Sequence, residues 1–178
     1  MPSLTISPVP EEDKSVLQHL MELYTYEFSV FEDLDVNAHG VYGYEYLDHY
    51  WTEEWRHPFL IRHENRLAGF ILIREMGEKD GVKVYSMAEF FILLKYRRLG
   101  LGRQAAFFAF DRFPGNWHVS EVERNLGAQA FWRKVIGEYT GGNYQEEWRW
   151  KDERRILVQT FSSVKPQPAQ SLRTGETH

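Results

Sequence analysis

The chain has 178 residues, with 21 Lys and Arg against 26 Asp and Glu and a net charge of -5. This length is enough for one domain with its own core, and the negative balance disfavours binding to a nucleic-acid backbone. The sequence contains no cysteine, which excludes disulfides, thiolate metal sites and a cysteine nucleophile. We find neither an apolar run of membrane-spanning length nor a signal peptide. We therefore expect a soluble, cytoplasmic protein with no metal, no nucleic acid and no membrane partner.

The first half of the chain predicts one strand, two helices and three further strands. A strand is predicted at 4–6, and a long amphipathic helix follows it, because apolar residues recur every three or four positions at Leu17, Leu20, Met21, Tyr24, Phe28 and Phe31. Residues 33–44 read as a loop before a short helix at 45–51. Strands at 59–62 and 67–74 form a hairpin, residues 76–81 a turn, and residues 82–93 a long apolar strand.

The second half predicts alternating helices and strands and then a tail. A helix at 103–112, a strand at 118–122 and a helix over 128–136 precede a closing hairpin of strands 144–150 and 155–161. We see no internal repeat and assign residues 1–163 to one domain. Residues 164–178 are rich in Pro, Gln, Ser and Thr, so we expect a disordered tail.

One segment is strongly acidic and rich in aromatic rings. Residues 15–55 contain no Lys or Arg, but they contain nine carboxylates: Glu22, Glu27, Glu32, Asp33, Asp35, Glu45, Asp48, Glu53 and Glu54. Ten Tyr, Phe and Trp residues from Tyr24 to Trp55 are interleaved with them. The segment is either a solvated anionic face or one wall of a site for a cation.

A glycine loop, defined here as residues 97–102, joins the long strand to the next helix and reads Arg-Arg-Leu-Gly-Leu-Gly. Glycines at such a turn let the backbone approach a ligand, and the free amides of the helix attract an anion such as a diphosphate. An ordinary solvated turn is the alternative. A phosphate loop of the Gly-Lys-Ser/Thr type is excluded because that motif is missing. Gly100, Gly102 and Ala105 also match a dinucleotide fingerprint, but too little chain remains for its sheet.

The loop and a later segment together resemble a known family. Arg97-x-x-Gly100-x-Gly102 resembles the acyl-CoA pyrophosphate loop of the GCN5-related N-acetyltransferase (GNAT) superfamily. Asn125-x-x-Ala128-x-x-Phe131-Trp132 resembles that family's N-x-x-A-x-x-L-Y segment, in the expected order. The resemblance covers roughly residues 3–162. It implies an α+β fold of three layers, with a mixed, mostly antiparallel central sheet flanked by helices.

The resemblance implies acetyl-CoA as co-substrate and a set of residues that contact it. Backbone groups of Ile92, Leu93 and Leu94 would meet the thioester and the pantetheine arm, and Asn125 would bond that arm or cap its helix. The pyrophosphate would be held by the loop and the helix start, from the side chains or amides of Arg97, Arg98, Leu99, Gly100, Leu101, Gly102 and Arg103.

Trp132 departs from the family pattern. Many members carry at this position a tyrosine thought to protonate the leaving thiolate, and an indole N–H does not deliver a proton at neutral pH. Either water supplies this proton, since a thiol with a pKa of about 8 to 9 leaves readily, or the tryptophan is core packing.

Two carboxylates are candidates for the base that deprotonates the acceptor amine. Glu89 lies three residues before Ile92 among apolar neighbours, which would raise its pKa toward neutral. Glu121, on the neighbouring strand, is the reserve, followed by His118. The competing interpretation of Glu89 is an outward-facing side chain on a half-exposed strand.

The expected activity is direct transfer of an acetyl group to a primary amine. The acidic, ring-rich segment predicts a cationic acceptor, either a small molecule or a protein amine, with Tyr26, Glu27 and Phe28 as contacts. A catalytically silent acyl-CoA-binding module and a NAD-dependent oxidoreductase remain as alternatives. The oligomeric state is left as monomer or homodimer.

Overall fold

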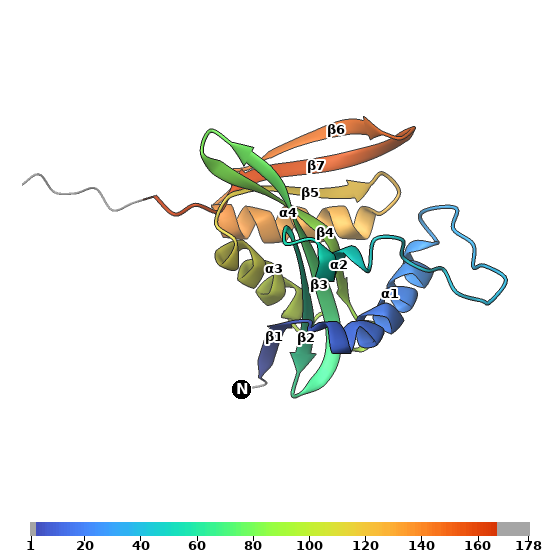
Figure 1. Ribbon diagram of the computed structural model, residues 1–178. Helices are drawn as coiled ribbons and strands as arrows, with labels where there is room; N and C mark the ends of the chain where they lie inside the picture. Colours follow the sequence, from blue (N-terminus) through green and yellow to red (C-terminus); the bar gives the residue numbers. More distant parts are fainter. Residues whose placement is uncertain (1–2, 167–178) are drawn as a thin grey trace, which may run out of the picture.

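The computed structural model has a central seven-stranded sheet in the order β1-β2-β3-β4-β5-β7-β6 (Figure 1). It describes residues 3–166. In chain order the elements are β1 (Leu4–Pro8), η1 (Glu11–Asp13), α1 (Lys14–Phe28), α2 (His49–Thr52), β2 (Arg56–His63), β3 (Arg66–Lys79), β4 (Val82–Ile92), η2 (Leu94–Tyr96), α3 (Leu101–Arg112), β5 (Asn116–Val122), α4 (Leu126–Thr140), β6 (Gln145–Lys151) and β7 (Arg154–Ser162).

Neighbouring strands are antiparallel except β4 and β5, which run parallel. The two-residue turns that make this pairing possible have left-handed backbone at Glu64 and Asn65 between β2 and β3, and at Asp152 and Glu153 between β6 and β7. The predicted mixed, mostly antiparallel sheet flanked by helices is confirmed.

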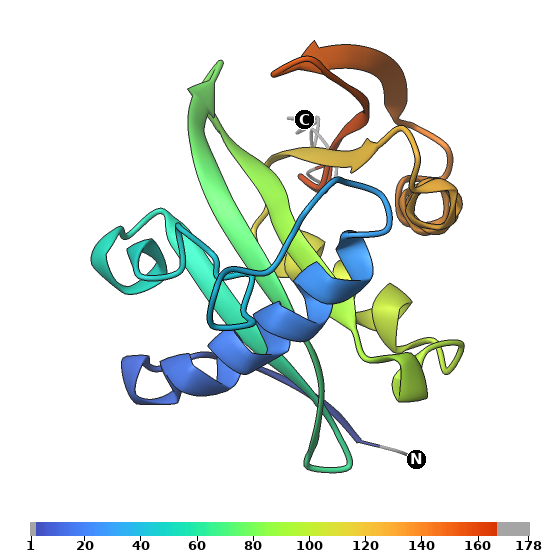
Figure 2. The same ribbon diagram turned by 90° about the vertical axis from the view of Figure 1, so that its right-hand side faces the viewer.

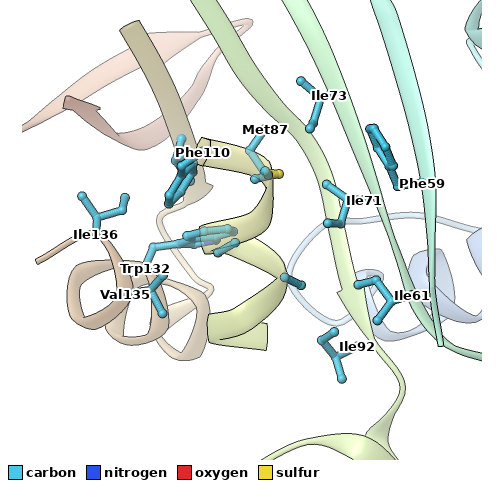
Figure 3. Packing of buried hydrophobic residues seen from close by; sticks show 14 of the residues in the cluster. Phe59, Ile61, Ile71, Ile73, Met87, Ile92, Phe110, Trp132, Val135 and Ile136 are labelled. Atoms are coloured by element: carbon cyan, nitrogen blue, oxygen red, sulfur yellow. The ribbon is translucent and has the colours of Figure 1, made fainter. Parts of the chain in front are cut away.

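Helices cover both faces of the sheet, so the molecule has three layers. On one face α1 packs Leu17, Leu20 and Met21 against Phe70 and Leu72 of β3. Figure 2 shows α1 crossing in front of β3 and β4. On the other face α3 and α4 bury a larger cluster, part of which Figure 3 shows: Phe110, Trp132, Val135 and Ile136 lie opposite Met87, Ile71 and Ile73. The apolar positions of each helix repeat every three or four residues because only one face of it meets the sheet.

Strands β4 and β5 separate soon after they meet. Their pairing is limited to Val84–Ser86 of β4 and Asn116–His118 of β5. In β4, Met87 pairs with Ile73 and Glu89 pairs with Leu72, so Ala88 is an extra residue that forms a β-bulge. The bulge bends β4 away from β5 at the point where the two strands diverge, and this opens the sheet next to Glu89.

Several element boundaries differ from the sequence prediction. The helix predicted at 45–51 is confined to His49–Thr52, and the long first helix ends at Phe28, before Phe31. The turn predicted at 76–81 is mostly strand, because β3 extends to Lys79 and pairs with β4 from Gly69 up to that residue. α3 begins at Leu101 rather than at residue 103, since Gly100 caps it with left-handed backbone, φ 78°.

Two further expectations concern the chain ends and membranes. The tail predicted at 164–178 lies outside the described residues from position 167 onward. Within residues 3–166, no helix has the length and apolar character required to cross a membrane.

Candidate active site

Glu89 projects from the bulged part of β4 toward α1 and accepts two phenolic hydrogen bonds. The Tyr24 hydroxyl of α1 donates to Glu89 Oε2 at 2.5 Å, and the Tyr44 hydroxyl, from the loop after α1, donates to Oε1 at 3.2 Å. Glu89 pairs with Leu72, whose side chain packs into the core beneath α1. The carboxyl therefore lies on the α1 side of the sheet, at the opening between β4 and β5.

The two tyrosines reach Glu89 for different local reasons. Tyr24 follows Leu17 and Leu20 at helical spacing, so it faces the sheet. Tyr44 is held by Glu22 of α1, whose carboxylate accepts hydrogen bonds from the backbone N–H groups of Tyr42 and Gly43, each at 2.8 Å. These two bonds fasten the loop to α1 immediately before Tyr44.

Burial and hydrogen bonding act in opposite directions on the Glu89 carboxyl. Burial raises its pKa to about 7, while the hydrogen bonds from Tyr24 and Tyr44 favour the ionised form and limit the rise. Burial and the neighbouring Glu89 also raise the pKa of both phenols, so they stay protonated and act as donors. At neutral pH Glu89 thus exchanges a proton readily.

A pocket of about 600 Å³, called here the β4–β5 pocket, contains Glu89. Its walls come from α1, the loop after α1, β4, β5 and the turn between β6 and β7. Five more carboxylates line it, from Glu32, Asp35, Glu45, Glu121 and Asp152, together with the rings of Tyr42 and Tyr46. The pocket also has cations, Lys151 and Arg154; Arg154 Nη1 pairs with Glu32 Oε2 at 2.6 Å. This ion pair joins the β6–β7 turn to the loop after α1.

A second pocket of about 990 Å³, called here the glycine-loop pocket, ends at the N-terminus of α3. Gly100, Gly102, Arg98 and Arg103 line it. The first backbone N–H groups of α3 have no partner within the helix and are directed out of its N-terminus, as an anion requires. A Cβ at Gly102 would meet the ring of Phe131 at 3.1 Å, so glycine at this position lets the start of α3 lie close to that ring.

The two pockets share one set of lining residues, and these mark where they join: Tyr24, Phe28, Phe90, Asn125, Ala128 and Trp132. Glu89 lies in sequence next to Phe90 and is bonded to Tyr24. A molecule extended from the α3 N-terminus would therefore bring its far end to the neighbourhood of Glu89.

The three arginines predicted for phosphate contact have different surroundings. Arg97 forms a bidentate pair with Glu27 at 2.5 and 2.7 Å and donates from Nε to the Ile92 carbonyl at 2.8 Å. Arg103 pairs with Glu138 at 2.5 Å, and Arg98 forms no ion pair with the residues that the structure describes. All three line the glycine-loop pocket; Arg98 and Arg103 are exposed, while Arg97 is half-buried and ties the loop to α1.

Some of the backbone groups predicted to meet the thioester and pantetheine already form hydrogen bonds within the chain. The Leu93 N–H donates to the Ala68 carbonyl at 2.8 Å, and the Ile92 carbonyl accepts from Arg97. Ile92 lines the glycine-loop pocket, while the side chains of Leu94 and Leu99 are 71% and 56% exposed. Leu101 is 3% exposed and belongs to the core, so its side chain anchors α3.

Asn125 and Trp132 both lie at the junction of the pockets. Asn125 Oδ1 accepts the Ala128 N–H at 3.0 Å, which makes it the N-cap of α4. Trp132 is 5% exposed and packs edge-on against Phe90 and Phe131, with ring centroids 4.9 Å apart in each pair. Trp132 therefore serves core packing and at the same time forms part of the wall shared by the pockets.

Glu121 occupies a different environment from Glu89. It follows Trp117 and Val119 at alternate positions of β5, on the face covered by α4, and is 5% exposed. Burial, and then the charge of Glu146, raise its pKa to about 8. Among the described residues neither of its oxygens has a hydrogen-bond partner. The carboxyl borders the β4–β5 pocket, and the nearby Arg133 charge and Gln159 amide only partly offset the effect of burial on its pKa.

The three predicted acceptor contacts of α1 separate in space. Phe28 lines both pockets, Glu27 lines only the glycine-loop pocket and is paired with Arg97, and Tyr26 is 70% exposed and lines neither. The sequence reasoning did not select Tyr24 and Tyr44. For Tyr24 the signal was available, because its helical spacing with Leu17 and Leu20 already directs it toward the sheet. For Tyr44, in a loop, no comparable pattern exists.

No group of three or more His, Asp or Glu residues within 3–166 is arranged to hold a metal ion. Parallel pairing in this part of the chain is confined to β4 and β5, so the doubly wound sheet of a dinucleotide fold does not surround the glycine loop.

Comparisons with known proteins agree with this geometry. A model of the acetyltransferase (GNAT) family matches residues 16–137, while a search of curated proteins finds no match. An acetyltransferase from Thermus thermophilus has 18% identity and a TM-score of 0.63, covering 90% of this chain and 97% of that one. Arabidopsis thaliana Naa50 in complex with the bisubstrate analogue CoA-Ac-MVNAL has 15% identity and a TM-score of 0.58, covering 90% and 99%. A spermidine N-acetyltransferase chimera from Vibrio cholerae and hSSAT has 12% identity and a TM-score of 0.59, covering 90% of this chain and 95% of that one.

The family model spans more than half of the chain. The chain belongs to the acetyltransferase (GNAT) family and is an acyltransferase of the N-acetyltransferase class. The resemblance seen in the sequence is confirmed.

Proposed function

We propose that this protein transfers an acetyl group from acetyl-CoA directly to a primary amine, with both substrates bound and Glu89 accepting the proton of the amine. The observation that carries the proposal is the position of Glu89. It lies in the β4–β5 pocket, bonded to Tyr24 at the junction with the pocket that ends at the α3 N-terminus. One pocket would then hold the amine and the other acetyl-CoA.

For acetyl-CoA, the proposal assigns the pyrophosphate to the first backbone amides of α3, from Leu101 to Arg103. Arg98 and Arg103 would add charge-assisted hydrogen bonds to the phosphates. The acyl end would reach the junction beside Phe90 and Trp132, at the opening between β4 and β5.

The chemical step needs three proton movements. Glu89 takes one proton from the ammonium group, and the free nitrogen attacks the thioester carbon to give a tetrahedral adduct. A backbone N–H of the splayed part of β4 would stabilise the oxyanion. The C–S bond then breaks, the nitrogen loses its second proton to water, and the thiolate takes a proton from water because Trp132 cannot donate one.

We propose that the acceptor amine is cationic before it is deprotonated. Glu32, Asp35 and Glu45 line the same pocket as Glu89, and Tyr42 and Tyr46 add ring faces that attract cations. Among the structural neighbours, one is a spermidine N-acetyltransferase and one binds a CoA-peptide analogue. Both small amines and protein amines are thus candidates for this chain.

A thermal-shift titration with acetyl-CoA, CoA and NAD(H) tests the co-substrate. A ligand present at about a hundred times its Kd adds about 2.7 kcal/mol to the free energy of unfolding, which raises Tm by several degrees. We expect acetyl-CoA and CoA to raise Tm and NAD(H) to leave it unchanged. A shift with NAD(H) alone, or with none of the three, would contradict the proposal.

Release of free thiol from acetyl-CoA tests the transfer and the acceptor class. We expect release with cationic amines such as diamines, amino sugars and lysine peptides to exceed release with neutral or acidic amines of similar size. Equal rates with both sets would contradict the cationic acceptor. Binding of acetyl-CoA without any thiol release above background would instead indicate a catalytically silent acyl-CoA-binding module, the function that Trp132 in place of tyrosine favours.

A further inference from the structure

Strand β6 is an open edge of the sheet, at the opposite end from β1 (Figure 1). All seven of its residues, Gln145 to Lys151, are exposed. One side of β6 pairs with β7, and the backbone N–H and C=O groups on its other side face no strand of the described chain. Proteins usually shield such an edge, since it is a template for pairing with another strand. β1, the other edge, is shorter and ends in Pro8.

The charges of β6 are arranged so that the strand complements its own copy. The strand reads Gln-Glu-Glu-Trp-Arg-Trp-Lys. When two copies run antiparallel with Trp148 on a two-fold axis, Glu147 of each copy faces Arg149 of the other. Opposite charges directly across an antiparallel pair stabilise it, and like charges destabilise it. The same arrangement puts Gln145 opposite Lys151, so no like charges meet.

Other registers bring like charges together. A two-fold axis perpendicular to the sheet keeps the same face of both copies on the same side, so it has to lie between one residue of β6 and its own copy in the partner. An axis at Glu146, Glu147 or Arg149 would place that residue directly opposite its own copy, so that two like charges meet. Through Trp150 it would set Arg149 against Lys151. Trp148 is the one central position of β6 that avoids these contacts.

Two large rings on β6 are exposed to solvent. Trp150 is 74% exposed and Trp148 is 40% exposed, and the two share one face of the strand with Glu146. In the register centred on Trp148, the two copies of Trp148 meet at the axis and Trp150 faces Glu146 of the partner. Tryptophan is enriched at the centres of protein interfaces because it buries a large area. Pairing would thus cover rings that the single copy leaves in water.

We propose that the chain forms a homodimer in which β6 pairs antiparallel with β6 of a second copy, about a two-fold axis at Trp148. The sheet then continues through both copies, with two Glu147–Arg149 pairs across the axis. The inference does not depend on the proposed function. It selects the homodimer from the two oligomeric states that the sequence left open.

Sedimentation velocity over a wide range of concentrations tests the dimer with charge-reversed variants. For the wild-type chain we expect a concentration-dependent monomer–dimer equilibrium. Glu147→Arg places two arginines opposite each other on both sides of the axis, and Arg149→Glu does the same with glutamates. We expect each variant to be monomeric wherever the wild type is dimeric. Glu12→Arg, an exposed reversal on η1, is the matched control and should dimerise like the wild type.

Mixing the two single variants separates pairing from any effect on folding. In the mixture, arginine of one chain faces glutamate of the other at both positions, so we expect a heterodimer although neither variant dimerises alone. The internal pair between Glu147 and Arg149 of one strand stays lost in this mixture, so it cannot account for the recovery. A wild type that is monomeric at all concentrations, single variants that dimerise normally, or a mixture that stays monomeric would each overturn the proposal.

Discussion

At Glu89, the carboxyl combines a pKa raised to about 7 with two hydrogen bonds from phenols, which favour its ionised form. Such a group is ionised and protonated in comparable amounts near neutral pH, which is what a general base for an amine requires. Glu121 is also buried, but neither of its oxygens accepts a hydrogen bond from the described residues. Glu89 is therefore the better candidate for the base, because its hydrogen-bond donors favour the ionised form.

Replacing Glu89 with glutamine keeps the shape of the side chain and removes its ability to accept a proton. We expect Glu89→Gln to lower kcat at neutral pH at least about tenfold, with the Kd of acetyl-CoA unchanged.

For the wild type, kcat/KM should rise with pH through about 7 and then level off, because the base is active when ionised. Thiol release as a function of pH measures both. Equal activity of the variant at all pH values would remove Glu89 from the mechanism.

The hydrogen bonds from Tyr24 and Tyr44 should set the pH at which kcat/KM rises, called here the acid limb. Removing a hydrogen bond to a carboxylate raises its pKa, so Tyr24→Phe should move the acid limb upward by about one pH unit. Tyr44→Phe should move it less, because its bond is longer, 3.2 Å against 2.5 Å. Tyr26→Phe is the matched control, since Tyr26 is exposed and lines neither pocket. A limb that stays at the same pH in both variants would contradict the positioning role.

The raised pKa of Glu121 predicts that the free energy of unfolding depends on pH. Its native pKa is about 8 against an unfolded value near 4.5, so between these values the native state holds a proton that the unfolded state has lost. Raising the pH through this window therefore destabilises the fold, and the loss is complete above 8. A glutamine at this position does not titrate, so Glu121→Gln does not lose stability as the pH rises through this window. We expect its Tm to exceed that of the wild type by several degrees above pH 8, with a smaller difference in acid. A difference in Tm that does not change with pH would contradict this.

At the scale of elements, Arg97 connects three parts of the fold. Its guanidinium joins Glu27 of α1 to the Ile92 carbonyl at the end of β4, directly before the glycine loop. Since the side chain is committed to these bonds, its contribution to acetyl-CoA binding would come from holding the loop in place.

Arg97→Gln and Glu27→Gln should therefore have the same effect. If the ion pair positions the loop, each variant raises the KM for acetyl-CoA severalfold and leaves kcat nearly unchanged. If Arg97 instead contacts phosphate, Arg97→Gln raises KM and Glu27→Gln lowers it, because the arginine is released. Steady-state kinetics of the two variants and of Arg98→Gln distinguishes these outcomes.

At the scale of the whole molecule, the net charge of -5 is distributed unevenly, with carboxylates gathered around the β4–β5 pocket. Such a field attracts a cationic acceptor and weakens as salt screens it. We expect the KM for a cationic amine to rise a few-fold between low and high ionic strength, while the KM for a neutral amine stays constant. Parallel salt titrations of the two substrates check this. The same salt dependence for both would contradict electrostatic attraction.

The order and type of most elements could be predicted from the sequence because each depends on local periodicity. The helical spacing of Leu17, Leu20 and Tyr24, and the glycines at 100 and 102, express their structure within a few residues. The family resemblance rested on the same kind of short-range pattern at residues 97–102 and 125–132. Ends of elements were less accurate, since β3 reaches Lys79 only through its pairing with β4.

What the tertiary structure decided is which side chains meet. Glu89 and Tyr44 are 45 residues apart in the sequence. They meet because β4 is bulged next to Glu89, because α1 packs on this face of the sheet, and because Glu22 of α1 holds the loop before Tyr44 by hydrogen bonds. No local pattern carries that information. Likewise Arg97, which the motif assigned to a ligand, is held by a glutamate 70 residues away. The sequence by itself determined the family, the fold and the glycine loop, because these follow from local patterns. The partners of each catalytic candidate arise from contacts between distant segments, and these form only on folding.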